Sequence, residues 1–230
     1  MEGTGGNGEA VRSDGKVELS GLVPLDRIEA TLGEPLQVQR IQTADLTRVL
    51  RDNSDALFGI AASAWHRIVT AGRFKVDPMQ MREYFEREDP GLARAVEKVI
   101  GQPLLKEFGF LRATIRVSGR AFVVATSCAA HLHSDELHLY DIAIADPRHP
   151  LTQRERKSDI QHHRGFGLLS EVMSNIFAAA QERNCSMVTL TAASHPLVDV
   201  FSRYSFVVEH NSFARDAMKF GMGIPMEAAV

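Results

Sequence analysis

Two glycines separated by one residue form the segment of the chain that most clearly predicts a binding function. The stretch His162-His163-Arg164-Gly165-Phe166-Gly167-Leu168-Leu169 follows a predicted strand and a polar loop, and it opens a strongly patterned helix. A strand that leads through glycines into a helix start presents backbone N–H groups to an anion, with the positive end of the helix dipole behind them. Glycines also serve tight turns that bind nothing. The preceding arginine and the long amphipathic helix favour a phosphate-binding turn.

Histidines elsewhere in the chain invite a metal-binding interpretation, which their spacing does not favour. His131 and His133 precede Ser134-Asp135-Glu136, which predicts a solvated turn, and together with His138 and the pair His162-His163 they match no common zinc arrangement. We therefore expect no metal site. Ser194-His195 lacks the Gly-x-Ser-x-Gly elbow of a serine hydrolase, so that activity is not expected either.

The elements that must position the glycine turn follow from the hydrophobic pattern. The helix after the glycines places Leu168, Val172, Ile176 and Ala180 on one stripe. Ser118-Gly119 predicts a hairpin turn between two of the strands. The predicted strands are Leu36–Ile41, Leu111–Val117, Arg120–Ser127, Leu137–Ile144 and Met187–Thr191, and a last hairpin is expected to pair Phe206–Glu209 with Phe213–Phe220.

The rest of the pattern predicts one domain with an appended leader and an insertion. Residues 1–18 hold too few apolar groups to offset the entropy of ordering, so they predict a disordered leader before a single domain over 19–230. Two helices are expected after Thr43 and from Ser54, the second with Trp65 in its buried face. A charged, helical insertion over 73–109 could cap a substrate cleft. A further helical face carries Leu197, Val200, Phe201 and Tyr204.

Composition narrows the class of protein. The chain of 230 residues is 44% hydrophobic, which suffices for one substantial core, and its net charge of −3 gives no general reason to bind nucleic acid or an anionic membrane. Its two cysteines, Cys128 and Cys185, lie in apolar sequence and predict buried thiols in a reducing compartment. No apolar run of about 18 residues occurs. We therefore expect a soluble, cytoplasmic protein.

The order of the predicted elements resembles that of the GNAT superfamily of N-acyltransferases. Gly165-Phe166-Gly167 matches the last three positions of that family's acyl-CoA motif, R/Q-x-x-G-x-G/A, with His162 at its first position. The segment Val200–Phe206 is similar to the family's "LYEKLGF" segment, and 38–45 is similar to its first strand and turn. The likeness spans roughly residues 36–220. It implies an α/β (α+β) fold with a mixed, mostly antiparallel central sheet flanked by helices.

The resemblance also implies a donor and its binding residues. The donor would be acetyl-CoA or another acyl-CoA, and no metal is required. The backbone amides of Arg164, Gly165, Phe166, Gly167 and Leu168 would hold the pyrophosphate. The strand Ile142-Ala143-Ile144 would pair with the pantetheine arm, which would enter where this strand splays from Met187–Thr191. Ser194 stands where the family often has an Asn that touches pantetheine.

The implied reaction is direct attack of an amine on the thioester in a ternary complex, which needs a base, an oxyanion donor and an acid. His138, near where some members place a catalytic Glu, and Asp141 are the candidate bases, and ordered water is a third possibility. At their spacing on a regular strand they point to opposite faces, so both cannot face one cleft. The family's usual acid, a Tyr, is replaced by Phe201, and Tyr204 is expected in the core.

Two other functions fit the same residues. One is a long-chain N-acyl synthase of the autoinducer or N-acyl amino acid type, which takes its acyl chain from acyl carrier protein. The basic loop from Arg154 to Lys157 could dock that carrier. The other is a non-catalytic module that binds coenzyme A or a partner, which the absence of the tyrosine permits. The acceptor, a small molecule or a protein, and the oligomeric state are left open.

Overall fold

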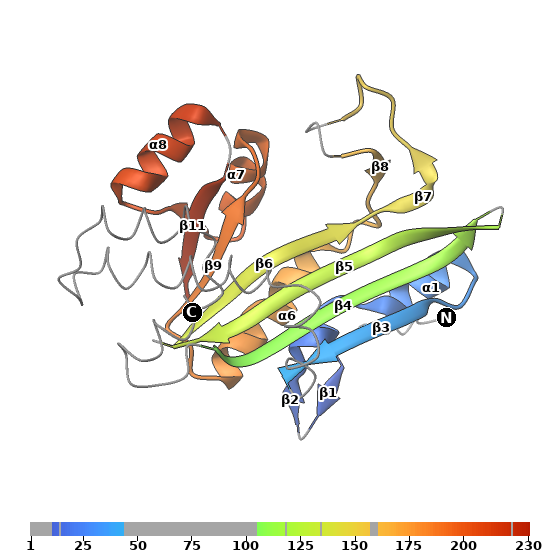
Figure 1. Ribbon diagram of the computed structural model, residues 1–230, viewed down its shortest axis with the longest axis horizontal. Helices are drawn as coiled ribbons and strands as arrows, with labels where there is room; N and C mark the ends of the chain where they lie inside the picture. The colour runs from blue at the N-terminus through green and yellow to red at the C-terminus, as the bar shows by residue number, and fades with distance from the viewer. Residues whose placement is uncertain are drawn as a thin grey trace, which may run out of the picture.

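A seven-stranded sheet forms the centre of the computed structural model, which describes residues 11–43 and 105–230 except for 14, 118, 134, 157–160 and 222. The strand order is β10-β11-β9-β6-β5-β4-β3 (Figure 1). Among these strands β6 and β9 pair in parallel, and the other neighbours are antiparallel. The sheet strands are β3 (Gln37–Gln42), β4 (Leu105–Val117), β5 (Arg120–Leu132), β6 (Glu136–Ile144), β9 (Met187–Ala192), β10 (Val207–Val208) and β11 (Ile224–Ala229).

Helices flank this sheet, as the resemblance implies, and the expected mixed, mostly antiparallel architecture is confirmed. The remaining elements are β1 (Arg12–Ser13), β2 (Lys16–Val17), the 3-10 turn η1 (Leu19–Gly21), α1 (Leu25–Leu32), β7 (Asp146–Pro150), β8 (His163–Arg164), α6 (Leu169–Glu182), α7 (His195–Ser202) and α8 (Ser212–Phe220). The predicted strands and the β4–β5 hairpin are present, with β4 and β5 longer than expected.

The core lies between the sheet and α6, which runs behind the strands in Figure 1. The predicted apolar stripe of α6 is buried: Val172, Met173 and Ile176 share one cluster with Leu137 and Leu190 of the central strands. Because neighbouring strand residues alternate in direction, His138 and Thr189 point to the other face of the sheet. We call this second face, which carries His138, the polar face.

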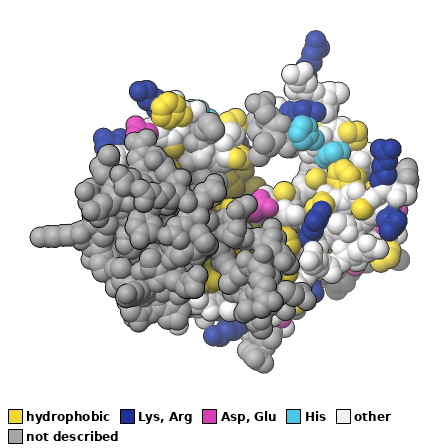
Figure 2. Space-filling model, in the orientation of Figure 1, with side chains coloured by type: hydrophobic (Ala, Val, Ile, Leu, Met, Phe, Trp, Pro, Cys, Tyr) yellow, Lys and Arg dark blue, Asp and Glu magenta, His cyan; other side chains and the backbone are white. Residues whose placement is uncertain are grey.

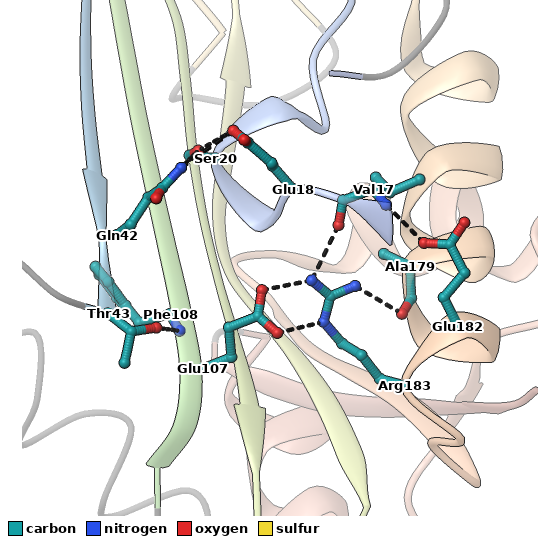
Figure 3. Close-up of polar contacts among 10 residues, drawn as sticks. All are labelled: Val17, Glu18, Ser20, Gln42, Thr43, Glu107, Phe108, Ala179, Glu182 and Arg183. Carbon is teal, nitrogen blue, oxygen red and sulfur yellow. Dashed lines mark hydrogen bonds and ion pairs between the residues drawn. The ribbon is translucent and has the colours of Figure 1, made fainter. Parts of the chain in front are cut away.

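The N-terminal segment is tied to the end of α6 (Figure 3). Arg183 donates to the Glu107 carboxylate through Nε (2.7 Å), to Val17 O (2.9 Å) and to Ala179 O (3.0 Å), and Glu182 accepts from Val17 N (2.6 Å). The prediction of a disordered leader over 1–18 does not hold for Arg12–Ser13 and Lys16–Val17, which pair as β1 and β2. These long-range polar contacts, together with Val17, which is buried in the core, tie the segment to α6.

The 3-10 turn η1 requires a glycine on the strand beside it. A Cβ added to Gly109 would lie 2.2 Å from the carbonyl carbon of Leu19, so the backbones of β4 and η1 are in contact there. The N-terminal segment continues into α1, which sequence analysis did not predict and which buries Ile28 and Leu32.

The C-terminal region differs from the predicted hairpin. Residues 212–220 form α8, because the Asn211 side chain accepts from Ala214 N (2.7 Å) at the helix start and Ala214 and Ala217 are buried three residues apart. β10 pairs instead with β11. The aromatic residues that suggested a strand, Phe213 and Phe220, are exposed on α8.

The two helices predicted after Thr43 and from Ser54, with Trp65, lie outside the described residues, and so does the insertion over 73–104. Its predicted last five residues, 105–109, belong to β4. None of the described helices combines the length and apolar composition needed to cross a bilayer.

Candidate functional site

The glycine turn lies at the start of α6, as the sequence predicts. Leu168 is the N-cap residue and makes no side-chain cap hydrogen bond, so within the described residues the first backbone N–H groups of the helix are left to other acceptors. Gly167 has φ +74°, and a Cβ added there would meet nothing within 4 Å. Open space beside Gly167, in front of a helix N-terminus, suits an anion such as the pyrophosphate of coenzyme A.

The turn lies against the end of β6. A Cβ on Gly165 would lie 3.4 Å from Ile144 O, which places Arg164–Leu168 beside the predicted pantetheine strand 142–144. Arg164 is exposed, and its charge contributes, after the hydrogen bonds from Thr152, to holding the pKa of Glu155 below its usual value. The predicted phosphate and pantetheine segments are therefore contiguous.

The strands β6 and β9 separate near the place that the resemblance implies. Their parallel pairing ends at Leu139 and Leu190, although β6 continues to Ile144 and β9 to Ala192. Such an edge offers backbone N–H and C=O groups to an extended chain with amide groups. Ser194 lies just past β9 as the N-cap residue of α7. Its Oγ is buried and has no hydrogen-bond partner in the described part of the chain, so a ligand amide would satisfy it.

The two candidate bases lie on the same face of the sheet. Ala130 pairs with His138, Ala129 with Leu139 and Cys128 with Asp141, so Tyr140 is an extra residue in β6. The expectation that His138 and Asp141 point to opposite faces is wrong, because this β-bulge inserts one residue between them.

The environments of the two candidates differ. Asp141 is exposed and accepts from Thr126 Oγ1 (3.0 Å). Burial, and then the charge of Asp141, raise the pKa of the Cys128 thiol to about 12, so this cysteine remains protonated and unreactive near neutral pH. His138 is buried, only 3% exposed, and contacts Thr189.

His138 belongs to a buried polar relay that also contains Thr189 and Glu136. Thr189 Oγ1 donates to Glu136 Oε1 (2.6 Å) and lies 2.8 Å from His138 Nδ1. A hydroxyl has a single hydrogen, so Thr189 must accept from His138 Nδ1–H, and this assigns the tautomer. In the neutral ring Nε2 is then the basic nitrogen. The Thr189 hydroxyl thus links the Glu136 carboxyl group to His138 Nδ1.

Sequence analysis missed Thr189 and Glu136. Glu136 was expected in a solvated turn, whereas it is 3% exposed and begins β6. In the sequence, the one sign of this relay is that Thr189 lies within an apolar strand. Thr189 is recognisable as a partner of Glu136 and His138 only once the register of β6 and β9 is known.

The remaining candidates from the sequence are structural. Phe201, at the position where the resemblance implies a tyrosine, is buried and packs edge-on against Phe206. Tyr204 packs on the core as expected, and its hydroxyl lies 2.9 Å from Ser170 Oγ. Cys128 and Cys185 are both buried and free. Across the described ranges, no group of three or more His, Cys, Asp or Glu side chains is placed to hold a metal ion.

A hairpin arm, β7 with β8, stands between β6 and the glycine turn and projects from the sheet (Figure 1). Figure 2 shows basic and histidine side chains gathered in this region. Arg148 is bonded to Glu34 (2.6 Å), and the His163 ring packs edge-on against Phe122. Arg154 is exposed on the arm. The arm therefore carries positive charge next to the predicted phosphate-binding turn.

Several solved structures are similar to this chain. Nourseothricin acetyltransferase is 16% identical over 53% of this chain and 65% of that chain, with a TM-score of 0.35. Ard1 from Thermoplasma volcanium is 17% identical over 62% and 80%, with a TM-score of 0.33. The paia N-acetyltransferase from Thermoplasma acidophilum, in complex with coenzyme A, is 12% identical over 85% and 99%, with a TM-score of 0.30. No protein-family description and no curated protein matches the sequence. Similarity at this level does not by itself assign an activity.

Proposed function

We propose that this chain is an N-acyltransferase that moves an acyl group such as acetyl from coenzyme A to an amine by direct attack in a ternary complex. One observation carries the proposal: the phosphate-binding turn, the open edge of β6 and the polar face are contiguous. Gly165 lies against Ile144 O, and the strand that ends there also carries Asp141 and His138. A donor lying along this path would bring its thioester to the polar face.

Each group of residues would have its own role in binding or catalysis. Arg164–Leu168 hold the pyrophosphate through backbone amides, 142–144 pair with the pantetheine arm, and Ser194 satisfies one of its amides. His138 accepts the proton of the attacking amine at Nε2. Thr189 and Glu136 hold the imidazole in the required tautomer, as second-layer hydrogen bonds do in other proton-transfer sites. Asp141 remains a candidate base, because the bulge places it on the same face.

Donor binding is tested by thermal unfolding with acetyl-CoA, coenzyme A and acyl carrier protein. A ligand at 100 times its Kd stabilises the folded state by about 2.7 kcal/mol, which raises Tm by several degrees in a chain of this size. We expect a rise with acetyl-CoA and with coenzyme A. A rise with acyl carrier protein alone would favour the long-chain synthase instead. No rise with any of them would refute both enzyme functions.

Gly167→Ala tests the location of the donor. The added Cβ would enter the open space in front of α6, so we expect the coenzyme A response to be lost. Gly15→Ala is a matched control, because Gly15 has φ +80°, also with nothing within 4 Å of an added Cβ, and lies in the hairpin tied to the other end of α6. Both variants carry the strain of a left-handed alanine, about 1 kcal/mol. An unchanged response in Gly167→Ala would place the donor elsewhere.

Transfer is tested by following coenzyme A release with a thiol reagent and a panel of primary amines: an aliphatic diamine, an amino acid and a peptide N-terminus. Amine-dependent release is expected for at least one of them, and His138→Gln should lower it by about 10²-fold or more, the usual contribution of a general base. Binding without release would support the non-catalytic module.

A further inference from the structure

The described site has a candidate base but no assigned acid. The position where related enzymes carry a tyrosine holds Phe201, which has no proton to give and packs against Phe206. The chain has three tyrosines. Tyr84 lies outside the described residues, and the hydroxyl of Tyr204 contacts Ser170 on α6. Tyr140 is the tyrosine that the described structure places on β6.

Tyr140 lies where β6 separates from β9. It is the extra residue of the bulge, and it directly follows Leu139, the last residue of β6 that pairs with β9. A bulge re-aims the side chain at the position where it occurs. The ring of Tyr140 lies beside that of His138, with centroids 6.5 Å apart and planes tilted by 60°, so both belong to the polar face. Its side chain is 42% exposed, whereas His138 is buried.

We propose that Tyr140 is the catalytic acid that protonates the departing thiolate, in place of the absent tyrosine at position 201. This inference rests on the proposed acyltransferase function. It assigns the proton donor to the strand that would bind the pantetheine arm rather than to the α7 segment.

His138 and Tyr140 together account for every proton that the proposed reaction moves. The amine nitrogen forms a bond to the thioester carbonyl carbon while His138 Nε2 takes one proton from that nitrogen. The C–S bond then breaks, its electron pair stays on sulfur, and the Tyr140 hydroxyl gives its proton to that sulfur. The proton held by His138 returns the Tyr140 oxygen to its neutral form. The net change is one proton moved from the amine to the thiol, with no oxidant or reductant.

The relay supports this sequence electrostatically. When His138 has accepted the amine proton, its positive charge stands beside the Tyr140 ring and stabilises the phenolate that forms as the thiolate departs. Glu136, through Thr189, offsets that charge in the buried layer beneath. The proposed base, His138, is buried, and the proposed acid, Tyr140, is exposed. This arrangement suits a reaction in which the amine and the leaving thiol occupy different positions.

Tyr140→Phe tests the inference, with Tyr204→Phe as the matched control. Both changes remove one phenol oxygen from a side chain that is not fully buried, so the free energy of unfolding should change little. Release of coenzyme A from acetyl-CoA is measured with the amine of the panel that gives the fastest release. In Tyr140→Phe we expect kcat to fall by about 10²-fold or more, while KM for acetyl-CoA and the thermal shift with coenzyme A stay unchanged. Tyr204→Phe should keep kcat within about twofold.

The pH profile separates a chemical role from a structural one. In the wild-type chain kcat should fall at alkaline pH as the acid loses its proton, and this limb should be absent in Tyr140→Phe and present in Tyr204→Phe. An active wild type with an unchanged kcat in Tyr140→Phe, or a lower kcat with the alkaline limb intact, would overturn this inference and leave the acyltransferase function standing. A wild type that binds coenzyme A and acylates none of the amines would overturn both.

Discussion

The buried relay of Glu136, Thr189 and His138 gives the sharpest stability prediction. Thr189→Val keeps the shape of the side chain and removes its hydroxyl, so Glu136 loses a donor at 2.6 Å and His138 Nδ1 loses an acceptor at 2.8 Å. Losing a hydrogen-bond partner costs a buried polar group about 1–3 kcal/mol, and Thr189→Val takes one partner from each of two groups, so we expect the free energy of unfolding to fall by about 2–6 kcal/mol. For a chain of this size that lowers Tm by about 4–24 °C.

Thr189→Ser is the control for this variant, because it keeps the hydroxyl and removes one buried methyl group, at a cost of about 1 kcal/mol. Urea unfolding of the two variants measures the difference between them. We expect Thr189→Val to be less stable than Thr189→Ser by about 1–5 kcal/mol. Equal stabilities would show that the relay contributes nothing to the fold and would remove the basis for assigning the His138 tautomer.

Three further predictions follow from single groups. Ser205 has φ +68°, a left-handed conformation that favours glycine, so Ser205→Gly should raise the free energy of unfolding by about 0.5–1 kcal/mol, and a lower Tm would contradict this. Burial raises the pKa of Cys128 to about 12 and of Cys185 to about 11, so at pH 8 both thiols should react with a thiol reagent only after unfolding in urea, and rapid labelling of the folded chain would contradict the assignment. Burial, and then the charge of Lys106, lower the pKa of His131, so below pH 6.5 the unfolded chain binds more protons than the folded chain and the free energy of unfolding decreases as the pH decreases. His131→Gln should therefore make this decrease between pH 6.5 and pH 5 shallower, and an unchanged slope would count against the assignment.

Much of the sheet could be predicted because its signals are local. The runs in β5, β6 and β9 are apolar and rich in strand-forming residues, and the dipeptide Ser118-Gly119 predicts the hairpin of β4 and β5, in which Val117 pairs with Arg120. Errors occurred where a local signal was ambiguous. Phe213 and Phe220 resemble a strand by composition, but the Asn211 cap and the buried Ala214 make the segment a helix.

The N-terminal segment shows a second limit. Its composition predicts disorder, yet the β1–β2 hairpin is held by Glu182 and Arg183, more than 160 residues away in sequence. A pattern read within a short window carries no information about such partners. The same holds for Thr189, whose partners Glu136 and His138 lie 53 and 51 residues before it.

For the candidate site, the sequence alone predicts the phosphate-binding turn, because Gly165, Gly167 and the stripe of α6 act through local backbone geometry and the helix dipole. The resemblance carried by those residues implies the donor and the pantetheine strand. Tertiary structure alone decided what lies on the polar face. One extra residue, Tyr140, reverses the direction of every side chain beyond it in β6 and so brings Asp141 to the side of His138. Strand direction depends on pairing with a neighbour, and pairing is a property of the folded sheet rather than of any one strand.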